Sequence, residues 1–361
     1  MRAVVTRPGA PGHVEMIELE PPLVRRGEVL IAMREVGVDG TDHEVIKGEH
    51  GGKVPPGADY LILGHESLGQ ILQMGARTKG LREGDWVVCT VRRPDDCPNC
   101  RRGQLDMCLW GQYTERGIKG AHGYLAELVS EKPKFIIRVP EHLCHLGALI
   151  EPLSIGEKAL SQAWLVQRRM YWEPRTALVF GLGTIGILAA MLLKLRGLET
   201  HVYSRDPVDS PEAALIREIG VNYISSENLP DPSDLGAMLK RIDLIIEATG
   251  SAKIAAAAMT LVQTNAVLCL LSITGASEPL TLDFAAINRQ LVLGNGVVVG
   301  SVNSSRPDFE RAISNLAAFE ERWPRLANHL ITRRVPFERY REAFAERAGD
   351  IKVLIEVSPA E

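Results

Sequence analysis

The sequence has 361 residues, of which 45% are hydrophobic and 24% charged, and its formal net charge is −4. A chain of this length exceeds the size at which one hydrophobic core keeps growing, so two domains are expected. The weak negative charge gives no reason to expect nucleic acid or an anionic membrane surface as a partner.

No targeting or membrane-spanning segment is predicted. Residues 1–5 lead directly into a strand pattern, without the apolar core and cleavage site of a signal peptide. The richest apolar run, after Thr184, is interrupted by Lys194, short of the roughly 20 residues that a spanning helix needs. We therefore expect a cytoplasmic protein.

The first half of the chain predicts a β-barrel. Short strand-like runs at 29–32, 71–72 and 86–90 are separated by turn-forming residues such as those at 82–85. Many short strands at this spacing are typical of a barrel rather than of a parallel sheet.

A polar turn follows the residues Val36-Gly37-Val38. Asp39 offers a carboxylate to a metal ion, Thr41 would project beside the same site, and Asp42 could accept a hydrogen bond from the non-ligating nitrogen of a metal-bound histidine. The alternative is a turn closed by an Asx-type hydrogen bond.

A histidine and a glutamate stand together behind a glycine, at His65 and Glu66. Gly64 allows the backbone to turn a corner after the apolar pair at 62–63. An imidazole nitrogen and a carboxylate are common ligands of catalytic zinc, although such a pair is also common on protein surfaces. Glu151, before Pro152, offers one more carboxylate, or is a glutamate favoured by the dipole at a helix start.

Three of the six cysteines are clustered, at Cys97, Cys100 and Cys108. In a reducing compartment such clustering favours metal binding over disulfides. The other three, Cys89, Cys144 and Cys269, lie in apolar runs and are interpreted as small buried residues.

The second half predicts a nucleotide-binding sheet. An apolar strand at 176–180 runs into a G-x-G-x-x-G motif and then into an apolar helix at 187–195. Gly181 would allow the tight turn, Gly183 would allow the close approach of a pyrophosphate, and Gly186 would allow the helix to pack on the strand. The remaining positions that we expect to contact the coenzyme are Thr184 and Ile185. Amide groups at the helix N-terminus would bind the phosphates.

The strand at 200–203 ends in Ser204 and Arg205, where enzymes that use NAD usually carry an acid. A hydroxyl and a guanidinium suit a 2′-phosphate, so NADP is the expected coenzyme. Asp206 leaves NAD as an alternative if its side chain turns inward. Further parallel strands are predicted at 242–250 and 266–271, which completes a doubly wound sheet.

Taken in order, these motifs resemble the zinc-dependent medium-chain alcohol and sugar dehydrogenases, in particular the glucose (aldose) dehydrogenase branch. The resemblance implies an α/β fold with a GroES-like β-barrel catalytic domain and a Rossmann domain. We expect residues 1–155 and 304–361 to form the first domain and residues 156–303 the second. Relatives form dimers or tetramers, so a homodimer or homotetramer is expected.

The resemblance also implies two zinc sites. Asp39, His65, Glu66 and Glu151 would serve the catalytic ion, with Asp39 replacing the cysteine of most relatives, as in halophilic glucose dehydrogenases. The spacing of the family's structural zinc lobe, C-x2-C-x2-C-x7-C, would place its first ligand at Pro94, which has none. Asp95, Asp96 or a residue after Cys108 would have to close a site begun by the three cysteines, or the lobe holds no metal.

For the substrate, the resemblance places Glu115 against sugar hydroxyls, and Asn303 near both nicotinamide and sugar. The alternative interpretation is that Glu115 is a solvated loop glutamate and Asn303 a loop asparagine, without a role in binding. His122 faces the sugar or is a structural turn histidine.

The expected reaction is zinc-dependent oxidation of an aldose, glucose in the first place, at C1 to the aldonolactone, with Thr41 passing the proton outward. The alternatives are a zinc-dependent polyol or alcohol dehydrogenase and an inactive nucleotide-binding regulatory protein. The retained His65, Glu66 and Glu151 disfavour the regulatory protein and a zinc-independent quinone reductase.

Overall fold

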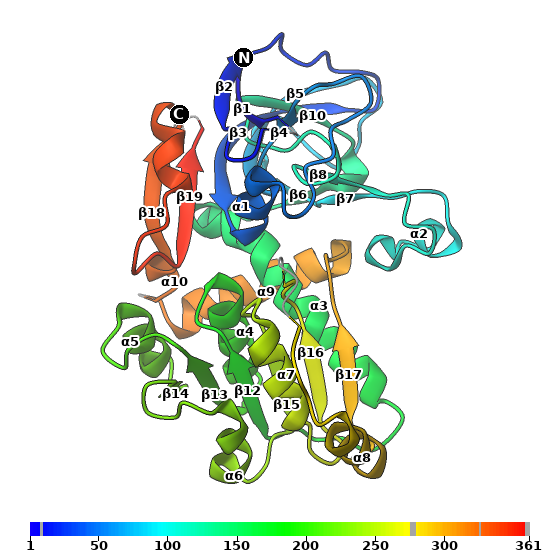
Figure 1. The fold of residues 1–361 in the computed structure, drawn as a ribbon. Coiled ribbons are helices and arrows are strands. Elements are labelled where there is room, and N and C mark those ends of the chain that lie inside the picture. Colours follow the sequence, from blue (N-terminus) through cyan, green and yellow to red (C-terminus); the bar gives the residue numbers. More distant parts are fainter. Residues whose placement is uncertain (8–9, 275–278, 325, 358–361) are drawn as a thin grey trace. The chain divides into compact units, whose positions relative to one another are not determined.

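A computed structural model describes residues 1–7, 10–274, 279–324 and 326–357 (Figure 1). The chain divides into two compact units, each with its own sheets. Unit 1 contains Met1–Ser154, Asn303–Ala318 and Ala327–Glu361, and unit 2 contains Ile155–Val302 and Phe319–Leu326. Among the described residues, no helix is both long and apolar enough to cross a membrane.

Unit 1 is built on a seven-stranded sheet with the order β11-β6-β5-β3-β19-β18, in which β10 also pairs with β3. Its strands are β3 (Val29–Val38), β5 (Glu66–Met74), β6 (Trp86–Cys89), β10 (Leu128–Glu131), β11 (Ile136–Arg138), β18 (Ile331–Pro336) and β19 (Lys352–Glu356). Among the described strands of this sheet, only β18 and β19 pair in parallel. The C-terminal strand β19 therefore lies beside β3, with Val353 opposite Val38.

Two smaller sheets and several short helices complete unit 1. The strands are β1 (Arg2–Thr6), β2 (Glu15–Glu18) and β4 (Leu61–Ile62) in one sheet, and β7 (Arg92–Arg93), β8 (Thr114–Arg116) and β9 (Gly120–Ala121) in the other. The helices are α1 (Gly40–Lys47), α2 (Pro98–Arg101) and the 3-10 helices η1 (Leu105–Met107), η2 (Pro133–Phe135), η3 (Glu141–Leu149) and η5 (Phe337–Phe344).

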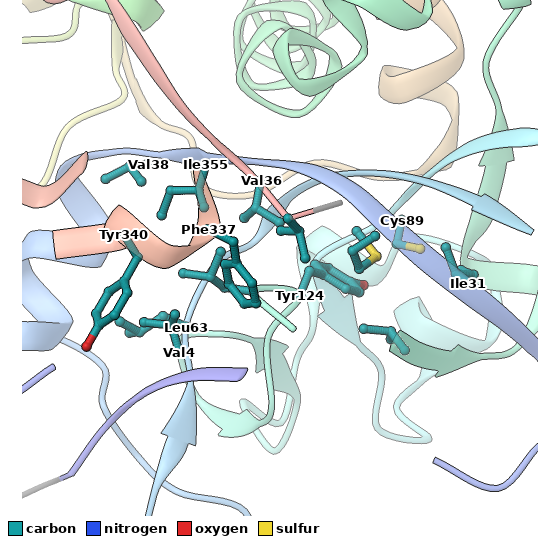
Figure 2. Close-up of a cluster of buried hydrophobic side chains, with 14 of the residues drawn as sticks. Val4, Ile31, Val36, Val38, Leu63, Cys89, Tyr124, Phe337, Tyr340 and Ile355 are labelled. Atoms are coloured by element: carbon teal, nitrogen blue, oxygen red, sulfur yellow. The ribbon is translucent and has the colours of Figure 1, made fainter. Parts of the chain in front are cut away.

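The core of unit 1 joins segments that are distant in sequence (Figure 2). Phe337 and Ile355 from the C-terminal segment are fully buried with Val4 and Leu63 from the start of the chain. Tyr124 is also fully buried, and its hydroxyl donates to the carbonyl of Thr90 at 2.9 Å. Because apolar burial is the main stabilising contribution, the segment that contains Phe337 and Ile355 is part of the barrel core.

Unit 2 is a parallel sheet with the order β14-β13-β12-β15-β16-β17 (Figure 1). Its strands are β12 (Thr176–Phe180), β13 (Glu199–Ser204), β14 (Asn222–Ser225), β15 (Leu244–Glu247), β16 (Val267–Leu270) and β17 (Val297–Gly300). Its helices are α4 (Thr184–Leu195), α5 (Pro211–Glu218), η4 (Pro232–Asp234), α6 (Leu235–Leu239), α7 (Ala252–Thr260) and α8 (Phe284–Gly294). The strand order reverses between β12 and β15, which is the dinucleotide-binding topology.

Three further helices include residues of both units: α3 (Ile150–Gln167), α9 (Arg306–Arg322) and α10 (Leu326–His329). The predicted combination of a β-barrel domain with a doubly wound domain is confirmed. The strand expected at 176–180 has those same bounds. All six cysteines are free thiols.

Candidate active site and coenzyme site

The two residues of the His-Glu pair follow a sharp corner between β4 and β5. Gly64 has a φ of +84°, and a Cβ atom there would lie 2.6 Å from a methyl group of Val36. Glycine is therefore required by both the backbone and the packing. The corner directs the side chains of His65 and Glu66 into the interior, where they are 4% and 1% exposed.

Asp39 lies between β3 and α1, and its two oxygens have different partners. Its Oδ1 accepts from the backbone N–H of Asp42 at 3.1 Å and so caps the helix, while Asp42 Oδ2 accepts from the N–H of Asp39 at 3.2 Å. The second oxygen, Oδ2, lies 3.4 Å from Nε2 of His65. Asp39 therefore holds the helix start with one oxygen and presents the other to His65. Thr41 lies partly exposed in the first turn of α1.

The interpretation of Asp42 as the acceptor for His65 is wrong. Asp42 Oδ1 is 3.9 Å from Nδ1 of His65, too far for a hydrogen bond, and accepts instead from the N–H of Gly64 at 3.3 Å. Nδ1 of His65 is buried without a hydrogen-bond partner among the described residues.

The candidate metal donors form two groups that share His65. One group consists of His65, Glu66 and Glu151, and the other of Asp39, Asp42 and His65. In each group, every residue has one donor atom that lies within 4.8 Å of the donor atoms of the other two residues. Among the described residues, the basic groups whose charges act on these four carboxyl groups are those of His65 and Lys352. Such an excess of buried negative charge is what a divalent cation would offset.

The pKa values of the cluster also reflect this excess of buried negative charge. Burial, with the charges of neighbouring carboxylates, raises the pKa of Glu151 to about 8 and that of Asp42 to about 7. Burial lowers the pKa of His65, but the charges of Asp39, Asp42 and Glu151 outweigh it and raise that pKa well above its ordinary value. The raised pKa values of Glu151 and Asp42 thus show that negative charge is disfavoured there, and the donor set is suitable for zinc.

Lys352 is the member of this cluster that the sequence analysis did not identify. It is 1% exposed, and its Nζ donates to both oxygens of Glu66, at 2.7 and 2.6 Å, and to the carbonyl of Val38 at 3.2 Å. A Cβ atom at Gly37 would lie 1.9 Å from Oε2 of Glu66, so glycine makes room for this pair. The sequence did contain a signal for this residue, because Lys352 begins the otherwise apolar strand β19. A lysine in such a strand is expected to be buried, and a buried lysine requires a charged or polar partner.

The predicted sugar-binding residues Glu115 and Asn303 meet, although 188 residues separate them. Nδ2 of Asn303 donates to Oε1 of Glu115 at 2.8 Å, and Arg92 donates to the same oxygen from Nε at 3.1 Å and from Nη2 at 2.9 Å. Among the described residues, the other oxygen of Glu115 accepts no hydrogen bond. His122 accepts at Nδ1 from the N–H of Ile62 at 3.3 Å and stacks on Tyr60, as a structural histidine does.

The cysteine lobe forms a compact group of four donors: Asp95, Cys97, Cys100 and Cys108. Asp95 Oδ2 accepts from Sγ of Cys108 at 2.8 Å, and its Oδ1 accepts from the N–H of Cys97 at 2.9 Å. Of the alternatives left by the sequence, Asp95 therefore lies with the three thiols, whereas Asp96 is exposed and outside the group. Three thiol groups and one carboxylate are the number and kind of donors that a structural zinc site could use.

The glycines after β12 have the spatial relations that a dinucleotide site requires. Gly181 has a φ of +104°, and a Cβ atom at Gly186 would lie 2.2 Å from the carbonyl oxygen of Gly181. A Cβ atom at Gly183 would meet nothing within 4 Å. Helix α4 begins after Gly183 without a side-chain cap, so its first N–H groups can bind phosphate. Thr184 and Ile185 lie partly exposed in that turn.

The predicted phosphate-binding residues lie at the end of β13. Arg205 is exposed, and Ser204 is 8% exposed, with its hydroxyl donating to the carboxylate of Asp206. The carboxylate of Asp206 therefore lies beside the strand end.

A GroES-like barrel with a buried group of metal donors, together with a parallel sheet carrying a dinucleotide turn, defines a medium-chain dehydrogenase. Residues 25–141 match the family model described as "Alcohol dehydrogenase GroES-like domain", and residues 144–357 match "Glucose dehydrogenase C-terminus". The chain belongs to the glucose dehydrogenase family.

Relatives match along the whole length. "Glucose 1-dehydrogenase" of Methanocella arvoryzae is 41% identical over 359 residues, which cover 99% of each chain. The structure of Haloferax mediterranei glucose dehydrogenase in complex with NADP, Zn and gluconolactone has a TM-score of 0.91 and 36% identity, with full coverage of both chains. Galactitol-1-phosphate dehydrogenase of Escherichia coli has a TM-score of 0.80 and 26% identity, covering 99% of this chain and all of the other.

Proposed function

We propose that this protein is a zinc-dependent glucose 1-dehydrogenase that oxidises an aldose at C1 to the aldonolactone, with NADP as hydride acceptor and NAD as an alternative. The observation that carries the proposal is the buried carboxylate-rich cluster around His65, whose excess negative charge fits a divalent cation. Unit 1 is then the catalytic domain and unit 2 the nucleotide-binding domain. The six free thiols support a cytoplasmic location.

Asp39, His65 and either Glu66 or Glu151 would hold the catalytic ion, and Lys352 donates to Glu66. Zinc held there would lower the pKa of the substrate hydroxyl, and the nicotinamide coenzyme would supply the hydride acceptor. Thr41, two residues after Asp39, carries a hydroxyl that can accept a proton and donate its own toward solvent. The helix-capping bonds of Asp39 keep its second oxygen directed at the ion site.

Purified protein supplied with zinc should form NADPH when glucose is added, and the initial product should be gluconolactone. Absorbance at the NADPH band and chromatography of the product would check this. Activity on a polyol such as sorbitol, without activity on glucose, would contradict the proposal and favour a polyol dehydrogenase.

Glu115 would recognise the sugar through Oε2, the oxygen that accepts no hydrogen bond from the described part of the chain. A carboxylate oxygen can accept from sugar hydroxyls, and a site built around such bonds rejects substrates that lack them. Arg92 and Asn303 fix the carboxylate through its other oxygen. A carboxylate fixed in this way would favour substrates that carry hydroxyl groups at the matching positions.

Replacing Glu115 with glutamine is expected to raise the KM for glucose about tenfold or more, because hydrogen bonds to a charged group are worth about 1.5–3 kcal/mol. Steady-state kinetics with glucose and with its deoxy analogues would measure the effect. Discrimination between them should decrease. The matched control is Glu49→Gln, an exposed glutamate of the same unit; equal KM values for the two variants would contradict the role of Glu115.

We also propose that the cysteine lobe holds a structural zinc ion with Asp95 as fourth ligand. Asp95→Ala is expected to lower the zinc content by one ion per chain at high chelator concentration, because three ligands leave the tetrahedral set open. Elemental analysis after dialysis and the spectrum of the cobalt-substituted lobe would show this. Asp96→Ala should behave like the wild type, and loss of zinc in that variant instead would move the assignment to Asp96.

Self-association would involve the free edge of the parallel sheet. Among the described strands, β17 is paired on one side only (Figure 1). The preceding helix α8 exposes Phe284, Val292 and Leu293 at 61%, 65% and 76%. An open edge strand beside exposed apolar side chains is an association surface. We infer that a second copy of the chain binds there.

Leu293→Glu is expected to convert the oligomer to a monomer, because a charge would be buried in an apolar interface. Light scattering coupled to size-exclusion chromatography would measure the mass. The control is Val208→Glu, which alters a valine that is 40% exposed elsewhere in unit 2. An unchanged mass for Leu293→Glu would place the interface elsewhere.

A further inference from the structure

A chain of hydrogen bonds within unit 1 connects the carboxylate of Glu115 to the start of α3, where Glu151 lies. At one end, Nδ2 of Asn303 donates to Oε1 of Glu115 at 2.8 Å. At the other end, the hydroxyl of Ser154 donates to the backbone carbonyl of Glu151 at 2.6 Å. Ser304 joins the two ends, because its N–H donates to Oδ1 of Asn303 at 2.8 Å and its hydroxyl lies 2.6 Å from that of Ser154.

The direction of the bond between the two serine hydroxyls follows from the number of protons available. Each hydroxyl has a single O–H to donate. That of Ser154 is donated to the carbonyl of Glu151, so Ser304 is the donor in the contact between the hydroxyls. Ser154 is fully buried and Ser304 is 2% exposed, so water cannot replace this bond if it is lost. The hydroxyl of Ser304 therefore anchors the main chain at this residue to the start of α3.

The backbone at Asn303 explains why such an anchor is needed. Asn303 has a φ of +59°, in the left-handed region that is unfavourable for residues with a side chain, although asparagine adopts it more readily than most. Its amide has two possible orientations. The N–H of Ser304 selects the one in which the amide oxygen faces Ser304 and the amide nitrogen faces Glu115. A displaced Ser304 would no longer select this orientation.

The amide of Asn303 acts on the same carboxylate oxygen as the guanidinium of Arg92. Oε1 of Glu115 accepts from Nε and Nη2 of Arg92 and from Nδ2 of Asn303. Because the protein donors occupy Oε1, Oε2 is the oxygen left for a sugar hydroxyl. The direction of Oε2 depends on both restraints, and the restraint by Asn303 depends in turn on Ser304.

We propose that Ser304 is a positioning residue for the sugar, an inference that rests on the proposed oxidation of glucose. Its hydroxyl bonds to Ser154 and its N–H bonds to Asn303, so it keeps the carboxylate of Glu115 in a fixed relation to the start of α3. Recognition of the sugar is thereby tied to the position of Glu151, a candidate ligand of the catalytic ion. Both donors of Ser304 are used within the protein, so it acts on the sugar only through its neighbours.

Ser304→Ala is expected to raise the KM for glucose about three- to tenfold, the effect of losing one buried hydrogen bond between neutral groups. The kcat should change by less than about twofold, because a loss of binding that is equal in ground state and transition state raises KM alone. The dissociation constant of glucose, measured by calorimetry without coenzyme so that no turnover occurs, should rise by a similar factor. Ser154→Ala removes the acceptor of the same bond and should have the same effect.

A double-mutant cycle with Glu115→Gln separates positioning from a general structural role. Because Ser304 acts through Glu115, Ser304→Ala in the Glu115→Gln background should change the KM by less than about twofold. A general structural role would instead give the same factor in both backgrounds. Circular dichroism of each variant verifies its fold.

The matched control is Ser314→Ala, at an exposed serine of unit 1 whose hydroxyl donates to the carbonyl of Glu310 at 3.1 Å. Its KM and dissociation constant should equal those of the wild type. An active wild type whose KM is unchanged by Ser304→Ala, or is changed equally in both backgrounds, would overturn the positioning role and leave the proposed function intact. Wild-type protein that oxidises no aldose would overturn the proposed function and this role with it.

Discussion

Replacing His65 with alanine is expected to reduce the rate of glucose oxidation about a thousandfold and to remove the catalytic zinc. His65 is the donor that both groups of candidate ligands share, so its loss leaves only carboxylates. Zinc contributes several kcal/mol to the stabilisation of charge in the transition state, and about 1.4 kcal/mol corresponds to a tenfold change in rate. Elemental analysis and steady-state kinetics on the same preparation would measure both effects.

The control for this variant is His142→Ala, which alters an exposed histidine of unit 1. It should retain both zinc and activity. An active His65→Ala preparation without metal would contradict the proposed chemistry, whereas an inactive one with its full zinc content would place the ion elsewhere.

Replacing Lys352 with methionine is expected to destabilise the protein by about 3–5 kcal/mol, the cost of leaving one charge of a buried ion pair without its partner. Lys352 and Glu66 are each 1% exposed, so water cannot solvate the remaining carboxylate. Chemical unfolding followed by tryptophan fluorescence would measure the loss. Removing the charge of both partners, in Lys352→Met with Glu66→Gln, should recover much of it.

Two controls make this second experiment specific. Lys79→Met, at an exposed lysine, should change stability by less than about 0.5 kcal/mol. Lys352→Arg keeps the positive charge and should be less destabilising than Lys352→Met, although the larger guanidinium must fit a closed site. If Lys352→Met were as stable as the wild type, the pair would have no structural role.

The coenzyme half could be predicted from sequence because its signals are local. The strand 176–180, the three glycines and the helix that follows are contiguous, and each glycine has a backbone or packing reason to be there. The orientation of Asp206 could not be predicted, because it depends on hydroxyl groups of a neighbouring strand, at Tyr223 and Ser225.

The catalytic half was predictable in its residue types but not in its contacts. Asp39, His65 and Glu151 could be identified as candidate donors from the sequence. That His65 lies with Asp39 in one group of donors and with Glu151 in another depends on the fold of the barrel. The prediction that His65 donates a hydrogen bond to Asp42 was wrong. Oδ1 of Asp42 accepts instead from the backbone N–H of Gly64 and lies 3.9 Å from Nδ1 of His65.

By itself, the sequence determined the family, the order of the two domains, the dinucleotide turn and the set of possible metal donors, since these depend on residue type and short-range spacing. Tertiary structure alone decided which distant residues meet: Lys352 with Glu66 across 286 positions, and Asn303 with Glu115 across 188. The physical reason is that buried charges must find partners, and the topology of the sheet, not the spacing along the chain, decides which partners are within reach.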